Sequence, residues 1–395
     1  MESVSAERSV EARIRQLRQQ FHLERSLEEL LSRKLRRRGQ CHPDAHGSRF
    51  ADIRAGLEAF LGDQIAGGFV ADNLKRMSGG GSNASYSFTL TRGDTVEQLV
   101  LRVKQAGTIE TSVSREFQMM EAMYGVLPIS RPCWMTEDSG YFGAPALISN
   151  LVPGVQAPSS KAIMASGMGV VYGEAAREKL APQFVRYEAR LHSYDWSGKN
   201  LSHFDIPRPG TTDAVDWRLS LWDRVWEEDK FEDHPTLLLT KEWLWNNRPI
   251  VDHVSVLHGD YRNGNFLYDE KSCEITGILD WELCSLGDRH SDLGYTMLRA
   301  WGHVGADGKF LNSGLMDTEA FTREYERESR LCVDPVRLHY YLVLAIYWSA
   351  VALIGTGIRN AELGQTQLDV LYHVIAGKGG FDIGELNRLV VRSEP

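Results

Sequence analysis

The stretch from His258 to Asp280 constrains this chain more than any other. A short apolar strand leads into the sequence HGDYRNGN, and a second expected strand delivers Asp280. The stretch therefore holds an aspartate, Asp260, an asparagine five residues later, Asn265, and a second aspartate after an apolar strand. Carboxylate and amide oxygens are hard ligands that suit magnesium. Read alone, Asp-x-x-Asn-Gly is also typical of a turn. The motif by itself therefore does not distinguish a turn from a reactive site, and residues elsewhere in the chain are needed as evidence.

These residues match the needs of phosphoryl transfer from a nucleotide. Such transfer requires a carboxylate that faces the acceptor hydroxyl and oxygen ligands that hold magnesium on the phosphates. Asp260 is the candidate catalytic residue, which orients the hydroxyl and takes its proton. Asn265 and Asp280 are the candidate magnesium ligands. His258 is expected to brace the loop through hydrogen bonds, and Asp292 is expected to do the same from the segment that follows.

A glycine-rich run lies between two expected strands nearer the N-terminus. Its residues are Gly79, Gly80, Gly81, Ser82 and Asn83. Backbone amides in such a loop can approach phosphate oxygens without obstruction by side chains, but an ordinary hairpin turn fits the run equally well. Arg102 on the next strand is the expected phosphate-binding residue, in preference to Lys104. Arg102 is also expected to pair with Glu116 on the following helix, where the alternative is a surface ion pair of little consequence.

Changes in the hydrophobic pattern divide the chain into three regions. Residues 1–65 are expected to form a helical extension, residues 66–150 a strand-rich region, and residues 151–395 a mostly helical region. A chain of 395 residues is long enough for a two-lobed enzyme with a sizeable core. The pattern therefore predicts an α+β fold, with the glycine run in the strand-rich region and Asp260 in the helical one.

The extension carries no catalytic signature. Apolar residues recur at helical spacing from about residue 5 to 38, which predicts one charged helix, and a second helix is expected from Ser48 to Leu61. The basic run from Arg33 to Arg38 favours a solvated helix face over a nucleic-acid patch. We expect the extension to pack on the body of the protein or on a partner subunit, in a homodimer formed through these helices.

Composition narrows the class of protein. The formal net charge of -9 argues against general nucleic-acid binding. The five scattered cysteines include no C-x-x-C pair and fit reduced thiols in a cytoplasmic protein. Acidic residues near the N-terminus disfavour a secretion signal. The uncharged segment from Tyr340 to Ile358 approaches the length of a membrane span, but its aromatic residues and terminal glycines favour a buried helix, so we expect no membrane association.

Together these motifs resemble the aminoglycoside phosphotransferase family of kinase-like small-molecule phosphotransferases. The similarity covers about residues 70–300 and includes, in the family's order, RMSGGGSN, LVLR, the HGDYRNGN block and ILDWE. It looks closest to the branch that includes the kinase-like domain fused to some acyl-CoA dehydrogenases. The resemblance implies a protein-kinase-like fold with a small antiparallel β-sheet N-lobe and a mostly helical C-lobe. It also implies ATP or GTP in the cleft between the lobes, with Mg²⁺ on the phosphates.

The resemblance also assigns positions within that fold. Asp260 takes the catalytic position of the family, and Asn265 and Asp280 take its metal positions. Asn150 lies in the expected hinge between the lobes, where the family binds its nucleotide. Arg102 departs from the pattern because related enzymes have lysine there, and a guanidinium binds phosphate as a fork rather than as a point charge.

The favoured function is a magnesium- and ATP-dependent kinase that acts on the hydroxyl of a small metabolite. The alternative is a catalytically weak nucleotide-binding or interaction module with the same fold. The acceptor stays open among an apolar alcohol, a hydroxyacyl thioester, a sugar and an aminoglycoside. A polycationic drug would need an acidic pocket, whereas the acidic residues at 317–328 are spaced like a solvated helix face.

Overall fold

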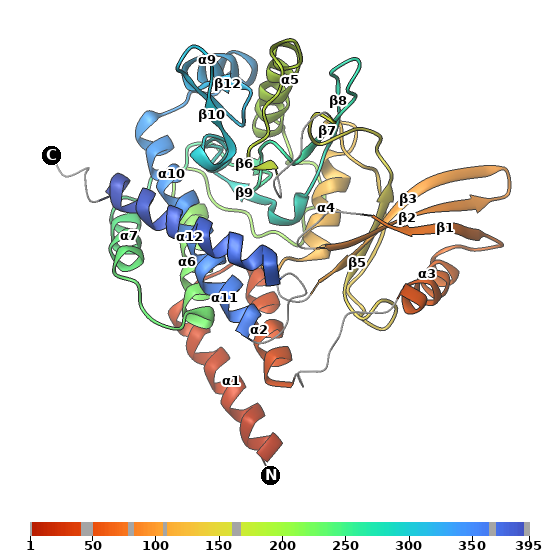
Figure 1. The fold of residues 1–395 in the computed structure, drawn as a ribbon. Coiled ribbons are helices and arrows are strands. Elements are labelled where there is room, and N and C mark those ends of the chain that lie inside the picture. The colour runs from red at the N-terminus through yellow and green to blue at the C-terminus, as the bar shows by residue number, and fades with distance from the viewer. Residues whose placement is uncertain are drawn as a thin grey trace.

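The structure, a computed structural model, describes residues 2–40, 50–77, 83–105, 109–159, 167–362 and 369–390. Figure 1 shows two regions side by side, a twisted sheet and a larger assembly of helices. The chain passes from the sheet to the helical assembly just after the fifth strand, near Asn150. The predicted α+β class, with a β-rich N-lobe and a mostly helical C-lobe, is confirmed.

The N-lobe sheet has five antiparallel strands in the order β1-β2-β3-β5-β4. Their bounds are Val70–Arg76 (β1), Asn83–Arg92 (β2), Thr95–Lys104 (β3), Pro132–Thr136 (β4) and Ala146–Asn150 (β5). Buried and half-buried residues alternate along β2 from Tyr86 to Leu90, as in a strand with one face in a core. Helix α3 (Phe50–Gln64) covers that face (Figure 1), and its Leu57 and Phe60 join the sheet's hydrophobic cluster.

The C-lobe is built from helices around three small groups of short strands. Its main helices are α5 (Glu174–His192), α6 (Asp213–Asp229), α7 (Pro235–Asn246), α8 (His290–Thr296), α9 (Thr318–Ser329), α10 (Pro335–Ala350), α11 (Ile358–Glu362) and α12 (Asp369–Val390). The helix that precedes them, α4 (Val113–Met123), belongs to the N-lobe. The paired strands are β6 (Ser255–Leu257) with β9 (Ser285–Gly287), β7 (Phe266–Tyr268) with β8 (Ile275–Ile278), and β10 (His303–Val304), β11 (Phe310–Asn312) and β12 (Met316–Asp317) together. The first two pairs hold the HGDYRNGN loop and Asp280 in place.

The expected single helix from about 5 to 38 is wrong in one respect, because the chain forms two helices. These are α1 (Glu2–Gln20) and α2 (Arg25–Gln40), separated by a short non-helical connection. The backbone N–H of Arg25 donates to Asp205 over 2.7 Å, so a carboxylate from a distant part of the chain caps α2. No glycine or proline marks the break, which explains why the sequence pattern continued through it.

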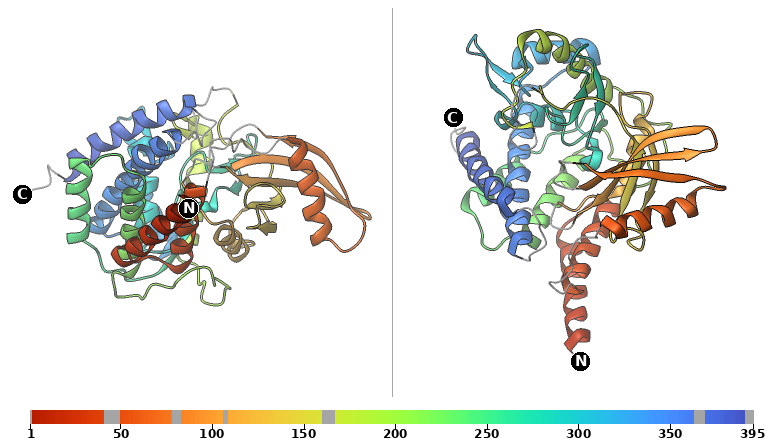
Figure 2. Two further views of the ribbon diagram at one scale, coloured as in Figure 1. Left: turned by 90° about the horizontal axis from the view of Figure 1, so that it is seen from below. Right: turned by 45° about the vertical axis from the view of Figure 1, so that its right-hand side comes forward.

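The basic run on α2 is a solvated face only in part, because Arg33 and Arg37 are exposed while Lys34 and Arg38 turn inward. Lys34 is buried and lies 2.7 Å from Glu228 and 3.2 Å from Asp229, and Arg38 also pairs with Asp229. Arg36 pairs with Glu11 of α1 at 2.6 Å. The run therefore attaches α2 to the end of α6. α1 extends below the rest of the molecule in Figure 1 and in the right view of Figure 2, while α3 lies on the sheet.

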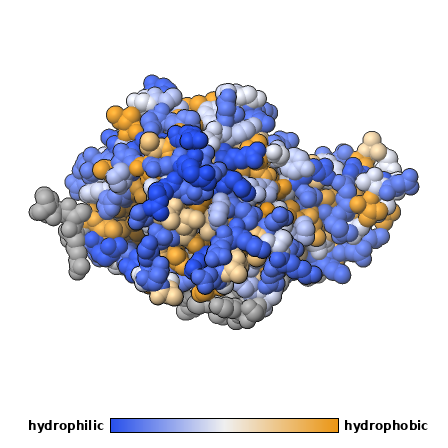
Figure 3. Space-filling view, turned by 90° about the horizontal axis from the view of Figure 1, so that it is seen from above, coloured by the Kyte–Doolittle hydropathy of each residue, from blue (hydrophilic) through white to orange (hydrophobic). Residues whose placement is uncertain are grey.

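The apolar C-terminal segment lies inside the C-lobe. Helix α10 continues through a π-helix (Val351–Gly357) into α11, and the described helix Pro335–Glu362 is long and apolar enough to cross a membrane. Its most apolar window, however, is 78% buried within the fold. That burial is typical of a core helix, as the aromatic residues of the segment predicted. Seen from above, the surface is mostly hydrophilic with small, separate apolar areas (Figure 3).

Candidate active site

The HGDYRNGN loop is held by a buried carboxylate from α8. Asp292 accepts hydrogen bonds from the backbone N–H groups of His258 (2.6 Å) and Gly259 (2.9 Å). His258 donates through Nε2 to the carbonyl of Leu279 (2.8 Å), just before Asp280, and accepts from the N–H of Asp260 through Nδ1 (3.2 Å). Burial lowers the pKa of His258, which favours the neutral ring that this arrangement uses. Both bracing roles expected from the sequence are present.

Asp260 is buried and bonded on both carboxylate oxygens. The side-chain amide of Asn265 donates to its Oδ2 over 2.6 Å, and Arg262 donates to Oδ1 over 2.8 Å. The Asn265 amide nitrogen is engaged by Asp260, which leaves its amide oxygen, the atom that binds metals, directed elsewhere. The structure thus brings the candidate catalytic residue and one candidate metal ligand into direct contact.

Asp280 lies two residues after β8, in an unusual backbone conformation. Its φ is +67°, in the left-handed region that non-glycine residues seldom adopt. Burial and the nearby carboxylates of Glu282 and Asp260 raise the pKa of Asp280 to about 8. A carboxylate destabilised by neighbouring negative charge fits a site for a cation, because a divalent ion would remove that repulsion.

The donor set also fits magnesium by its number of ligands. Among the described residues, no three His, Cys, Asp or Glu side chains gather into a metal-binding group. Magnesium in nucleotide sites is usually held by one or two carboxylates together with phosphate oxygens and water. Asp280 and the amide oxygen of Asn265 match that requirement.

A cleft of about 360 Å³ lies between the two lobes. Five of the predicted site residues line it: Asn83, Arg102, Asn150, Asn265 and Asp280. Asn83 begins β2 and donates to Glu282 over 3.4 Å. Asn150 ends β5, and its side chain accepts from the backbone N–H of Arg131. Residues from β2, β3 and β5 therefore face the metal-binding candidates across the cleft. Gly79, Gly80, Gly81 and Ser82 lie outside the described residues.

Two basic residues of β3 are held by acidic partners. Arg102 pairs with Glu116 of α4, and the Glu116 side chain is almost wholly buried, so the pair is not the surface contact considered as the alternative. Lys104 lies 2.6 Å from Glu282. Of the two, Arg102 is the one that lines the cleft, as expected from the sequence.

Sequence reasoning missed three residues of this region. Arg262 lies inside the loop motif and pairs with Asp260, but nothing in the spacing distinguishes it from a surface residue. Glu282, two residues after Asp280, accepts hydrogen bonds from the side chains of Lys104 and Asn83. Gln156 lines the cleft and donates to the carbonyl of Gly264 over 2.9 Å. For Glu282, its position in the ILDWE block was an available signal, but the sequence pattern assigned a role only to Asp280 of that block.

Comparisons with known proteins agree with this geometry. The sequence profile of the phosphotransferase enzyme family matches residues 73–327. Human acyl-CoA dehydrogenase family member 11 is 26% identical over 324 residues, which cover 78% of this chain and 39% of that protein. Matches to family members 10 and 11 span between 21% and 40% of those proteins. The predicted resemblance to the branch with acyl-CoA dehydrogenase fusions is confirmed.

Solved structures support the same conclusion for the fold. A candidate aminoglycoside phosphotransferase from Ralstonia eutropha superposes with a TM-score of 0.63 at 20% identity, covering 86% of this chain and 98% of that one. The GDP and kanamycin complex of APH(2")-IIIa gives a TM-score of 0.54 at 16% identity, covering 86% and 99%. The fold is kinase-like, and the chain belongs to the phosphotransferase enzyme family.

Proposed function

We propose that this protein transfers the γ-phosphate of ATP to a hydroxyl group of a small molecule in a magnesium-dependent reaction. The observation that carries the proposal is the contact between Asp260 and Asn265, at 2.6 Å, beside a cleft that Asn265 and Asp280 both line. A simple turn requires neither the cleft nor Asp280, whereas phosphoryl transfer requires a carboxylate, metal ligands and a cleft for the nucleotide. GTP is a second candidate donor for the same cleft.

Asp260 would act on the acceptor. Its carboxylate accepts a hydrogen bond from the acceptor hydroxyl, orients the oxygen toward the γ-phosphorus and takes the proton as the new O–P bond forms. The bond between the γ-phosphorus and the β,γ-bridging oxygen breaks, and its electron pair leaves with ADP. Arg262 balances the charge of Asp260 and fixes its orientation through two hydrogen bonds of 2.8 and 3.2 Å.

The other residues would hold the donor. Asn265 and Asp280 supply oxygen ligands for magnesium, which when bound neutralises charge on the phosphates. Arg102, fixed by Glu116, extends its guanidinium into the cleft, where a fork of N–H groups matches phosphate oxygens. Asn150 lines the cleft at the point where the chain crosses between the lobes.

A coupled assay of ADP release tests the proposal. Purified protein with magnesium and ATP is tested against a panel of hydroxylated metabolites, and product phosphate esters are identified by mass spectrometry. We expect transfer to at least one alcohol, with a loss of about 1,000-fold or more in Asp260→Ala. The matched control is Asp94→Ala, in the exposed turn between β2 and β3, which should keep full activity.

The alternative function predicts a different result. A nucleotide-binding module with a kinase-like fold would bind ATP tightly and release no ADP with any alcohol of the panel. Equal ADP release by wild-type protein and Asp260→Ala would also contradict the proposal, because it would identify a contaminating or Asp260-independent activity.

A further inference from the structure

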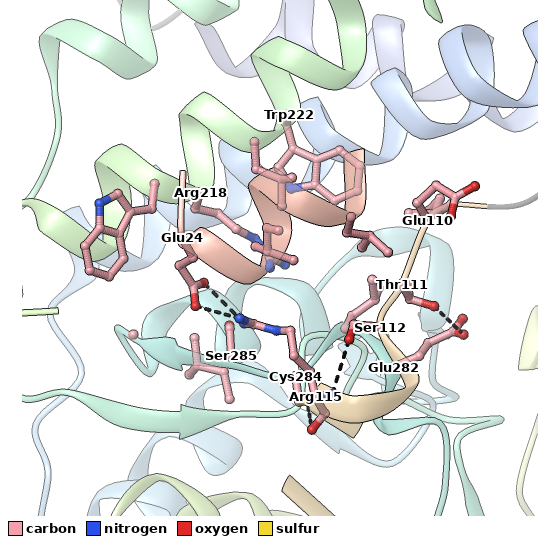
Figure 4. A pocket seen from close by; sticks show the side chains of 18 of the residues that line it. Glu24, Glu110, Thr111, Ser112, Arg115, Arg218, Trp222, Glu282, Cys284 and Ser285 are labelled. Carbon is pink, nitrogen blue, oxygen red and sulfur yellow. Dashed lines mark hydrogen bonds and ion pairs between the residues drawn. The ribbon is translucent and has the colours of Figure 1, made fainter. Parts of the chain in front are cut away.

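A second pocket lies beside the cleft and is closed on one side by α2 and the residue that precedes it, Glu24. It is lined by α2, by the residues leading into α4, by α6 and by the segment 282–288. Figure 4 shows Glu24 and the start of α2 on one wall and Ser285, Cys284 and Glu282 on another. Because the family match begins at residue 73, α2 is an addition to the matched region that shapes this pocket.

The pocket adjoins the two segments that carry the proposed catalytic residues, since Leu257 and Glu282 line it. Its lining includes Glu282, whereas the preceding residue, Trp281, lines the nucleotide cleft, and the two hollows share no residue. Leu283 also lines the pocket, and its carbonyl packs so closely on Gly259 that a Cβ there would lie 2.3 Å from it. Gly259 directly precedes Asp260. The pocket therefore borders the catalytic segment on a side that the nucleotide cleft does not occupy.

Most of the charge in the pocket is already neutralised. The charged residues that line it are Glu24, Lys34, Glu110, Arg115, Arg218, Glu282 and Asp288. Arg115 and Glu24 pair with each other at 2.7 Å, within the pocket itself. The remaining ones, apart from Arg218, pair with charged residues outside the lining. Arg218 is therefore the one charged side chain of this lining whose charge is not paired with that of another described residue.

Arg218 has no such partner. Its Nε atom is buried without a hydrogen bond to any residue that the structure describes, and no described carboxylate forms an ion pair with its guanidinium. The carboxylates of Asp292 and Glu24 act on it electrostatically, but Asp292 is bonded to the backbone of His258 and Gly259, and Glu24 is bonded to Arg115. It lies over the ring of Trp222 of its own helix, with its guanidinium carbon 5.9 Å from the ring centre, and that contact supplies no counter-ion. Burial lowers the pKa of Arg218, yet a guanidinium remains protonated at physiological pH. A half-buried cation without a counter-ion is costly to hold in place, and an anionic ligand group would offset that cost.

The rest of the lining is mainly apolar. It includes Leu27, Leu30, Leu31, Leu221, Trp222, Val225, Leu257 and Leu286. Trp222 stacks on Trp348 of α10 with ring centroids 5.0 Å apart, so this wall is backed by the core. The pocket volume is about 70 Å³, against about 360 Å³ for the cleft. A slender apolar body fits such a space better than a branched, polycationic sugar.

We propose that this pocket binds the phosphate acceptor, and that the acceptor is an apolar alcohol that carries one anionic group bound by Arg218. The anionic group is a carboxylate or a phosphate, since a guanidinium fork matches both. This inference rests on the proposed phosphotransferase function and adds the substrate class to it. It also makes α2 a specificity element, since Leu27, Leu30 and Leu31 contact the apolar body.

Binding is measured first, without nucleotide, so that the result does not depend on catalysis. Isothermal titration calorimetry compares medium-chain hydroxyalkanoic acids, the matching hydroxyalkyl phosphates, the methyl esters of the acids, and kanamycin. We expect the anionic alcohols to bind, and the neutral esters to bind about 10- to 100-fold more weakly, as the loss of one charge-assisted hydrogen bond implies. The acid and phosphate series show which anionic group is preferred.

Variants then assign the effect to Arg218. Arg218→Gln should weaken binding of the anionic alcohols about 10- to 100-fold and leave the esters and the KM for ATP nearly unchanged. Arg218→Lys should restore part of the loss, because it keeps the charge. Arg186→Gln, which removes an exposed arginine of α5, is the matched control. Leu27→Glu should weaken anion binding more than Leu27→Lys, although both place a charge on the same wall.

The outcomes separate this inference from the function on which it rests. Esters or kanamycin that bind and react as well as the anionic alcohols, or Arg218→Gln with unchanged affinity, would overturn the inference while leaving phosphotransferase activity intact. Arg218-dependent binding of the anionic alcohols without phosphate transfer to any alcohol would overturn the proposed function instead. Arg218-dependent binding together with Asp260-dependent transfer to the same compounds is the result we expect.

Discussion

Glu24, in the connection between α1 and α2, receives two hydrogen bonds from Arg115 of α4, at 2.7 and 3.2 Å. Both side chains are buried, and Arg115 also stacks on Phe204 with its guanidinium carbon 4.0 Å from the ring centre. The next residue of α4 is Glu116, which holds Arg102 in the cleft. The pair thus connects the N-terminal helices to the helix that positions Arg102, the proposed phosphate-binding residue.

Removing Glu24 should destabilise the protein substantially. Glu24→Ala leaves the Arg115 guanidinium buried without its carboxylate, and loss of one partner of a buried pair costs about 3 to 5 kcal/mol. Chemical denaturation measures the free energy of unfolding. The control is Arg25→Ala, which breaks the exposed contact with Asp205 and should cost less than about 1 kcal/mol. Similar losses for the two variants would show that the buried pair has no special role.

Asp292 should act as a positioning residue for the catalytic loop. Asp292→Asn replaces an oxygen that accepts from the N–H groups of His258 and Gly259 with an amide N–H₂, which repels one of them. We expect kcat to fall about 10- to 100-fold, since small displacements of a catalytic group have effects of this size, while the KM for ATP changes little. An unchanged kcat in a folded Asp292→Asn protein would contradict this role.

Magnesium removal should abolish transfer without unfolding the protein. EDTA in excess is expected to stop ADP release, and added magnesium should restore it. Asp280→Asn should need about 10-fold or more magnesium for half-maximal rate, because it replaces the anionic ligand with a neutral one. Thermal melts in EDTA check the fold. Full activity in EDTA, or an unchanged magnesium requirement in Asp280→Asn, would remove these residues from the metal site.

Local pattern was enough to predict the sheet and the contact between Asp260 and Asn265, but not the pocket beside them. Asp260, Asn265 and Asp280 belong to short segments whose spacing carries their chemistry, and β2 alternates as a strand should. The break after α1 and the role of Arg218 depend on contacts between residues far apart in the chain. Arg218 lies on α6 and lines a pocket with α2 only in the folded protein. Periodicity contains no signal for such a contact.

The basic run on α2 illustrates the same limit. A cluster of Lys and Arg on a helix is usually solvated, and only the position of Asp229 and Glu228 at the end of α6 makes Lys34 a buried residue. The sequence contains both halves of this contact, but they are separated by 195 positions. Charge complementarity between them becomes visible only with the fold.

Gly259 should not tolerate a side chain. Its φ is +83°, and a Cβ would lie 2.3 Å from the carbonyl oxygen of Leu283, so Gly259→Ala combines an unfavourable backbone conformation with a backbone clash. We expect loss of activity and a lower unfolding temperature. Gly93→Ala is the control, because its φ is also positive but nothing lies within 4 Å of the added carbon. Equal effects of the two would indicate that only the backbone conformation matters.

Docking of α2 should weaken in acid through Asp229. Burial alone would raise the pKa of Asp229, but Lys34 and Arg38 of α2, with a hydrogen bond from Thr356, outweigh it and lower the pKa below its usual value. A carboxyl group with a lowered pKa in the folded state contributes stability that is complete above its unfolded pKa of about 4. That contribution declines as the pH falls through the lower folded pKa. The difference in unfolding free energy between wild type and Asp229→Asn should therefore be constant near neutrality and shrink below about pH 4.

Denaturation at a series of pH values measures this difference. The matched control is Asp233→Asn, since Asp233 is exposed and pairs only with Lys230 among the residues that the structure describes; its difference from wild type should be small throughout. A tryptophan-fluorescence or proteolysis assay of the α2 region should report release of the helix over the same acidic range, before the C-lobe unfolds. A difference for Asp229→Asn that stays constant down to pH 2 would show that the carboxylate does not supply the acid sensitivity. In that case the attachment of α2 would rest on its apolar contacts, such as the buried Leu30 and Leu31, rather than on its ion pairs.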